Sequence, residues 1–241
     1  MLKADLHLHS NYIQKKGEGS LSPKEIIDFY AKNNFEVLSI TEHASVLFNN
    51  RLIIFKNVLK TYHDFKNYAK SKGILLIPGF ELFIEGKEVL ILNYLGDVTK
   101  LKTFKDLKKI KNKNILIIAP HPYYKLKQCL KEKLIENINL FDAIEYAHMY
   151  LRFFNKFNQK AVKTAEKYKK PIIGNSDGHH QFQMNTTYTL IDSKKDINSV
   201  IKAIKQNKVK LQTKPLSFLK FIRIIMLVIK AAIKKHVIKQ F

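Results

Sequence analysis

Short apolar runs alternate along the chain with longer stretches in which apolar residues recur every three or four positions. The short runs are rich in β-branched residues and predict strands, whereas the longer stretches predict amphipathic helices. We expect strands around 5–9, 37–41, 74–81, 88–95, 115–119, 143–146, 172–174, 187–192 and 209–211. We expect helices at 23–34, 52–72, 100–112, 127–137, 155–169 and 196–206. This alternation argues for a parallel sheet covered by helices.

Local signals support several of these boundaries. Ser22 and Glu25 have the spacing of a capping box, which predicts that a helix begins after Ser22. Gly73 is placed to end the helix that precedes it. Gly86 and Lys87 predict the turn of a hairpin.

The first strand carries the first candidate chemistry. Strict alternation would place Asp5, His7 and His9 on one face, with Leu6 and Leu8 on the other. Two imidazoles two residues apart can both reach one divalent cation, and a carboxylate beside them can bind it or fix a histidine tautomer. An ordinary edge strand with a polar face would give the same pattern.

Histidines and carboxylates recur where later strands are predicted to end. Together with the first strand, these positions are His7, His9, His43, Glu81, His121, Glu145, Asp177 and His179. In an α/β barrel the carboxyl ends of all strands converge on one face, where active sites are built. The sequence therefore predicts one shared metal-binding cavity.

These motifs resemble the PHP (polymerase and histidinol phosphatase) family of metal-dependent phosphoesterases. The matching stretches are Asp-Leu-His-Leu-His-Ser at 5–10, Ser-Pro-Lys-Glu-Ile at 22–26, Thr-Glu-His at 41–43, Pro-Gly-Phe-Glu at 78–81, Pro-His-Pro at 120–122 and Ser-Asp-Gly-His at 176–179. The resemblance implies a distorted (β/α)7 TIM-like barrel, assigned to 1–214, that holds two to three divalent ions. We expect residues 215–241 to form a separate basic, amphipathic C-terminal helix or tail.

The resemblance also implies roles for individual residues. One ion would be held by His7, His9, Glu81 and Asp177. Glu81 would bridge to a second ion bound by His121, and a third would be bound by His43 and His179. The catalytic residues would be Glu81, Asp177 and His179, supported from behind by Asp5, Glu42 and Glu145.

The chain departs from the family pattern at three places. Glu18 stands in the first loop where relatives commonly have Asp or His, and Glu88 stands where many have His; we expect both to be metal ligands. Glu42 and His43 replace the usual Asp-His pair. Because carboxylates suit harder ions, we expect Mn²⁺ or Fe²⁺ to be preferred over Zn²⁺.

Two residues beyond the strand around Glu145 are candidates for substrate binding. His148 and Arg152 could contact a phosphate group, with Arg152 binding it through two hydrogen bonds. A solvated helix start would explain both equally well. Cys129 lies in a predicted Lys-rich helix and is assigned no role.

The composition adds a strong positive charge. The net charge is +23, almost entirely from lysine. Nucleic acid is one partner that such a charge suits, but a surface built to grip it would use more arginine, so we favour a general compositional bias. The single cysteine excludes an intramolecular disulfide, and no signal peptide is visible, so we expect a cytoplasmic protein.

The tail from residue 216 is both basic and apolar. Lys220, Arg223 and Lys230 interrupt it, so it does not read as a membrane span. It fits a helix lying on an anionic membrane surface, a helix docking on a partner, or a helix packing on the barrel.

Hydrolysis of a small phosphate ester is the function that these features favour. The alternatives are a nuclease or nucleotide phosphatase, suggested by the charge, and a scaffold that uses the basic tail to bind a membrane or partner. The sequence does not predict an oligomeric state.

Overall fold

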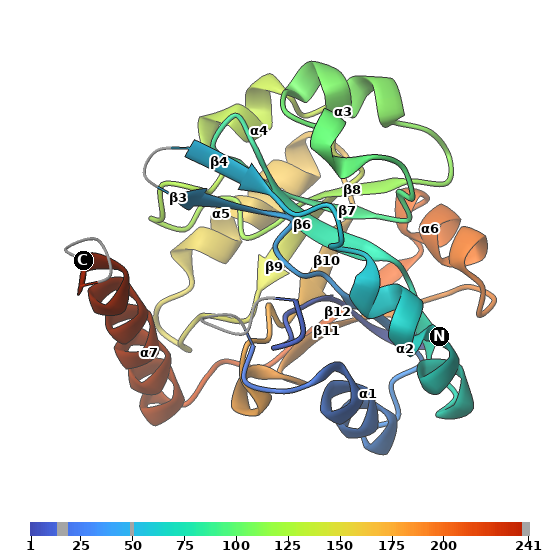
Figure 1. Ribbon diagram of the computed structural model, residues 1–241, viewed down its shortest axis with the longest axis horizontal. Coiled ribbons are helices and arrows are strands. Elements are labelled where there is room, and N and C mark those ends of the chain that lie inside the picture. The colour runs from blue at the N-terminus through green and yellow to red at the C-terminus, as the bar shows by residue number, and fades with distance from the viewer. Residues whose placement is uncertain (14–18, 49–50, 238–241) are drawn as a thin grey trace.

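The computed structural model describes residues 1–13, 19–48 and 51–237. Its strands lie in the middle of the molecule and its helices surround them (Figure 1). The predicted α/β class is confirmed, while the arrangement of the strands differs from the expected barrel.

The strands form two five-stranded sheets and one hairpin. The first sheet has the order β12 (Val209–Thr213), β11 (Thr187–Ile191), β1 (Leu2–Leu8), β2 (Val37–Ile40) and β5 (Leu75–Leu76). The second sheet has the order β10 (Ile172–Asn175), β9 (Ala143–Ala147), β8 (Leu116–Ala119), β7 (Lys87–Leu92) and β6 (Gly79–Ile84). The hairpin pairs β3 (Ser45–Phe48) with β4 (Arg51–Ile54).

Most of the helices pack against the sheets. They are α1 (Pro23–Lys32), α2 (Lys60–Ser71), α3 (Phe104–Ile110), α4 (Glu132–Glu136), α5 (Lys156–Lys167), α6 (Ile197–Lys205) and α7 (Phe218–Val237), with short 3₁₀ turns at Val98–Lys100 and Gln181–Gln183. One apolar cluster joins α1 and α2 to the first sheet, and another joins α3, α4 and α5 to the second. A third cluster is shared by both sheets and α6.

Several local predictions are confirmed. Ser22 and Glu25 form the complete capping box that starts α1. The hairpin between β6 and β7 turns at Glu85 and Gly86, one residue earlier than expected, and both residues have positive φ, which suits a tight turn between twisted strands.

Two predicted helices were wrong in extent. The expected helix at 52–72 begins only at Lys60, because residues 51–54 form β4, whose Ile53 pairs with Val46 of β3. Short apolar runs do not distinguish strand from helix by periodicity alone. The expected helix at 127–137 is limited to Glu132–Glu136.

The expected closed barrel is not formed, because the two sheets are open and mixed. Strand β7 is antiparallel to both β6 and β8, and β11 is antiparallel to both β1 and β12. Where β10 lies beside the first sheet, side chains form hydrogen bonds with backbone groups that would otherwise pair strand to strand. Asn175 Oδ1 accepts from the Leu6 amide at 2.9 Å, and Thr189 Oγ1 bonds both the amide and the carbonyl of Gly174 at 2.9 Å.

The other junction between the sheets depends on a glycine. A Cβ at Gly79, the first residue of β6, would lie 2.4 Å from Ser39 Oγ of β2 and 2.4 Å from Leu92 Cδ2 of β7. Only a residue without a side chain lets β6 approach β2 this closely. Glu81 follows two residues later, so this contact helps to place it.

We predict that Gly79→Ala lowers the free energy of unfolding by about 1–3 kcal/mol, because the added methyl overpacks the junction. Urea unfolding in the presence of a chelator would measure the effect without a contribution from bound ions. Lys70→Ala, on the exposed side of α2, is the control and should change stability by less than about 0.5 kcal/mol. Equal stability of the two variants would contradict the packing argument.

Candidate metal centre

Strand β1 is irregular where it delivers its histidines. Its pairing with β2 shifts register between Asp5 and Leu8. The carboxylate of Asp5 accepts from the Tyr30 hydroxyl of α1 at 2.6 Å and from the Ser176 amide at 3.2 Å. Asp5 therefore ties β1 to α1 and to the segment that carries Asp177.

Four side chains converge at the carboxyl end of β1. His7 Nε2 lies 3.4 Å from Glu81 Oε2 and 3.5 Å from Asp177 Oδ1. His9 Nε2 lies 3.6 and 3.2 Å from the same two oxygens, and 3.2 Å from His7 Nε2. Donors that bind one ion at about 2.1 Å in a tetrahedron or octahedron stand roughly 3.0–3.4 Å apart. The four residues thus have the spacing of ligands around a single ion.

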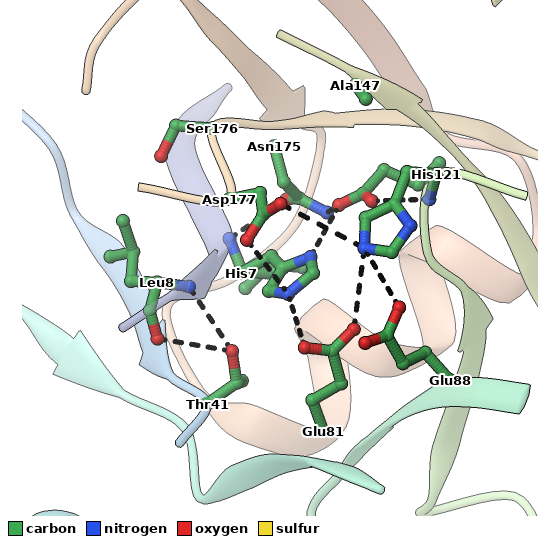
Figure 2. Close-up of polar contacts among 12 residues, drawn as sticks. His7, Leu8, Thr41, Glu81, Glu88, His121, Ala147, Asn175, Ser176 and Asp177 are labelled. Carbon is green, nitrogen blue, oxygen red and sulfur yellow. Dashed lines mark hydrogen bonds and ion pairs between the residues drawn. The ribbon is translucent and has the colours of Figure 1, made fainter. Parts of the chain in front are cut away.

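Glu81 and Asp177 each direct their second carboxylate oxygen toward His121. Its Nε2 lies 3.5 Å from Glu81 Oε1, and 3.9 Å from both Glu88 Oε2 and Asp177 Oδ2 (Figure 2). A carboxylate can bind two ions through its two oxygens, which an imidazole nitrogen cannot do. Glu81 and Asp177 therefore stand where they could bridge two ions.

Buried acceptors without partners mark the same place. Glu81 Oε1 and Glu88 Oε2 are buried and make no hydrogen bond within the described residues. Burial, together with the charge of Glu81, raises the pKa of Glu88 to about 7. A cation between these oxygens would satisfy both of them and hold Glu88 in its ionised form.

A third group of imidazoles adjoins the first. The rings of His43 and His179 stack on His9, with centroids 4.5 and 4.3 Å from it. His43 Nε2 is also 3.1 Å from Glu81 Oε2. Burial and these neighbouring rings lower the pKa of His9 to about 4, which keeps its imidazole neutral and able to bind a metal. The three histidines could hold an ion together.

Glu145 lies directly behind the ring of His7. Glu145 Oε1 accepts from His7 Nδ1 at 3.0 Å and from the Asn175 side chain at 2.9 Å. Glu145 Oε2 accepts from the backbone amide of His121 at 2.8 Å. An imidazole that donates through Nδ1 presents Nε2 with a free lone pair, so Glu145 orients His7 as a ligand.

Glu42 is hydrogen-bonded to neighbouring side chains and backbone. Its carboxylate accepts from the hydroxyl of Ser10, from the amide of Ser10 at 3.2 Å and from Thr61 Oγ1 at 3.2 Å. The adjacent His43 forms an isolated bridge with Glu81, which joins the end of β2 to β6. Glu42 therefore braces the segment that carries His43.

Two members of the cluster have strained backbones. His121 has φ 27° and Asp177 has φ 45°, in the left-handed region that residues with side chains rarely adopt. Such conformations persist only where surrounding contacts enforce them, and they gather at functional sites.

The remaining predicted residues have different outcomes. His148 is buried, with Nε2 3.2 Å from Gln183 Nε2 and Nδ1 without a partner among the described residues, so it is not part of a solvated helix start. Arg152 is exposed, and its guanidinium lies over the Phe153 ring rather than in the cluster. Glu18 falls outside the described residues.

The sequence interpretation missed Cys129. Its thiol is fully buried, and Sγ lies 3.6 Å from His121 Nδ1. The segment around it was expected to be a helix, and no spacing along the chain relates Cys129 to the histidines. Asn175 was missed too, although its position at the end of a strand beside Asp177 was a usable signal.

The residues present fit divalent metal ions. Imidazoles and carboxylates suit Mn²⁺, Fe²⁺ and Zn²⁺, and the buried oxygens without hydrogen bonds need a positive partner. The described groups that could hold an ion are His7, His9 and Glu81; His9, His43 and His179; His7, His121 and Glu145; Glu88, His121 and Cys129; and His43, Glu81 and Glu88.

Together, fold and site define an α/β protein with a buried cluster of imidazoles and carboxylates where its two sheets meet. Residues 5–177 match the PHP domain family, and residues 155–209 match a PHP-associated region. The chain therefore belongs to the PHP domain family, as its motifs predicted.

Individual relatives are distant. The uncharacterized protein MJ1587 of Methanocaldococcus jannaschii is 27% identical over 159 residues, which is 63% of this chain and 84% of that protein. A two-domain protein from Bacteroides vulgatus, containing a predicted PHP-like metal-dependent phosphoesterase, has a TM-score of 0.69 at 18% identity, covering 92% of this chain and 68% of that one. PsfC from Pseudomonas syringae has a TM-score of 0.57 at 15% identity, with 98% of each chain covered. The two structures support the fold.

We predict that Glu145→Gln weakens metal binding about 10- to 100-fold while leaving the fold intact, because the amide cannot accept from His7 Nδ1 with the strength of a carboxylate. Competition with a chromogenic chelator would measure the affinity. Glu166→Gln, on the exposed side of α5, should bind metal like the unaltered protein. Unchanged affinity in Glu145→Gln would contradict the role of Glu145 in orienting His7.

Proposed function

We propose that the protein is a metal-dependent hydrolase of phosphate esters, with a small phosphomonoester as its substrate. The observation that carries this proposal is the arrangement of Glu81 and Asp177, each of which directs its two oxygens at different imidazoles. Such an arrangement suits a centre with two or three ions rather than an isolated structural ion.

Different residues of the cluster would hold different ions. His7, His9, Glu81 and Asp177 would hold one ion, His121 and Glu88 would complete a second, and His43 and His179 would hold a third. When bound, such ions activate water for attack at phosphorus and offset the charge of the phosphoryl group. With three carboxylates near the centre, we expect Mn²⁺ or Fe²⁺ to be favoured over Zn²⁺.

His148 could hold the phosphoryl group. Burial lowers its pKa to about 4, so its imidazole is neutral. If Nε2 accepts from the Gln183 amide, the proton stays on Nδ1, which has no partner within the described residues. A buried donor left unsatisfied is costly, and a phosphate oxygen would satisfy it.

A cavity of about 640 Å³ beside the cluster could receive the rest of the substrate. It is lined by His180, Lys220 and Arg223 together with apolar side chains such as Phe182. His180 directly follows His179, and the amide of Ser20, another lining residue, donates to the His179 carbonyl at 2.7 Å. The cations would favour a substrate with a second anionic group.

We predict that Glu81→Gln lowers kcat/KM for a chromogenic phosphomonoester by about 100-fold or more, because several kcal/mol of charge stabilisation depend on the ions it holds. Elemental analysis of the unaltered protein should find at least two ions per chain, and chelation should abolish activity. Glu132→Gln, at an exposed carboxylate of α4, is the matched control and should remain active.

Two results would contradict the proposal. One is less than one ion per folded chain after incubation with Mn²⁺, Fe²⁺ or Zn²⁺. The other is full activity in Glu81→Gln. Hydrolysis of single-stranded DNA in preference to small esters would instead favour a nuclease.

We also propose that residues 215–241 attach the protein to an anionic membrane surface. Among the described residues, no helix is both long and apolar enough to cross a bilayer. Helix α7 buries Ile224 against the rest of the molecule, yet it exposes Phe218, Leu219, Ile225 and Met226. Figure 1 shows α7 at the edge of the molecule, away from the sheets. An exposed apolar face beside lysines suits an interfacial helix.

We predict that the protein sediments with anionic but not neutral vesicles, and that salt weakens this binding because the attraction is screened within about 8 Å at physiological ionic strength. Each basic residue near the surface contributes about 1 kcal/mol. The double variant Leu219→Ser with Met226→Ser should no longer sediment with anionic vesicles and should keep hydrolase activity. Leu95→Ser alters an exposed leucine elsewhere and should still sediment. Failure of the unaltered protein to bind would end this proposal.

A further inference from the structure

Cys129 faces the nitrogen of His121 that points away from the carboxylates. Its Sγ lies 3.6 Å from His121 Nδ1, whereas His121 Nε2 lies 3.5 Å from Glu81 Oε1 and 3.9 Å from Glu88 Oε2. The two sides of this ring are therefore occupied by different chemistry, with sulfur on one side and carboxylates on the other.

The loop that carries Cys129 is held against the centre. The amide of Lys131 donates to the Pro122 carbonyl at 2.8 Å and closes the loop, and the amide of Glu88 donates to the Gln128 carbonyl at 2.9 Å. Cys129 packs in a small buried cluster with Tyr124 and Ala147. The sulfur is consequently fixed relative to both His121 and β7.

An independent feature on this side of the centre points to a cation. The side chain of Glu88 is only 7% exposed, and its Oε2 has no hydrogen-bond partner within the described residues although it is directed at His121 Nε2. A buried carboxylate oxygen in this position calls for a cation.

The ring of His7 shows how such a ligand is held. Its Nδ1 donates to the Glu145 carboxylate at 3.0 Å, which leaves Nε2 for the metal. His121 has no carboxylate beside Nδ1 in the described structure, because Glu145 meets its backbone amide instead. The sulfur of Cys129 lies at the position from which an acceptor would bind His121 Nδ1, as Glu145 binds His7 Nδ1.

We propose that Cys129 is a positioning residue, whose sulfur accepts the Nδ1 proton of His121 and so presents Nε2 to an ion shared with Glu81 and Glu88. This inference rests on the proposed function, since it assumes that the centre binds metal. The Cys129 sulfur is a weaker hydrogen-bond acceptor for His121 than the Glu145 carboxylate is for His7. The second ion should therefore be the one that depends on residue 129.

Calorimetric titration of the metal-free, full-length protein with Mn²⁺ tests this inference. The unaltered protein should show two resolved affinities, and Cys129→Ala should weaken one of them about 10- to 100-fold while leaving the other unchanged. Cys129→Ser should recover part of the loss, because a hydroxyl can accept from Nδ1. Leu130→Val is the matched control, since it trims the neighbouring buried side chain without touching His121.

The outcomes separate the possible roles of Cys129. Equal affinities in Cys129→Ala and the unaltered protein would overturn the inference, as would an equal loss in Leu130→Val. If Cys129→Ala fails to fold, Cys129→Ser must show the selective weakening by itself. A sulfur-to-cobalt charge-transfer band in the Co²⁺ protein would make Cys129 a direct ligand and would also overturn it. Failure of the unaltered protein to bind any ion would instead reject the proposed function.

Discussion

The crowding of carboxylates and imidazoles at one largely buried point is the constraint around which this molecule is organised. Glu81 and Glu88 are buried and Asp177 is partly buried, and their carboxylates lie beside the imidazoles of His7 and His121. Removing such groups from water costs several kcal/mol each unless charge and hydrogen bonds compensate. Divalent cations would supply that compensation, and the geometry of the donors fits them.

The open arrangement of the sheets makes this concentration of donors feasible. Because side chains of Asn175 and Thr189 replace the ladder at one junction, and Gly79 lets the sheets approach at the other, strand ends from both sheets reach a single point. His121 and Asp177 reach this point with strained backbone conformations. The fold stabilises an arrangement that an isolated loop could not maintain.

Behind the donors, the protein uses different acceptors for different rings. A carboxylate fixes His7, and in our proposal a thiol fixes His121. Unequal outer partners would give the ions unequal affinities, which links the chemistry of one buried cysteine to the occupancy of the whole centre. In our proposal, His148 and the cavity lined by Lys220 and Arg223 would provide donors and cations for an anionic substrate.

The sequence by itself was sufficient for the family, most strand positions, the capping box of α1 and the cluster of histidines and carboxylates at strand ends. These features are encoded by residue type and short spacing, which local physics can interpret. Tertiary structure alone decided that the sheets stay open, that Asp5 turns toward Tyr30, that Arg152 lies outside the cluster, and that Cys129 meets His121. Each of these depends on pairing register or on contact between segments distant in the chain, for which no local periodicity exists.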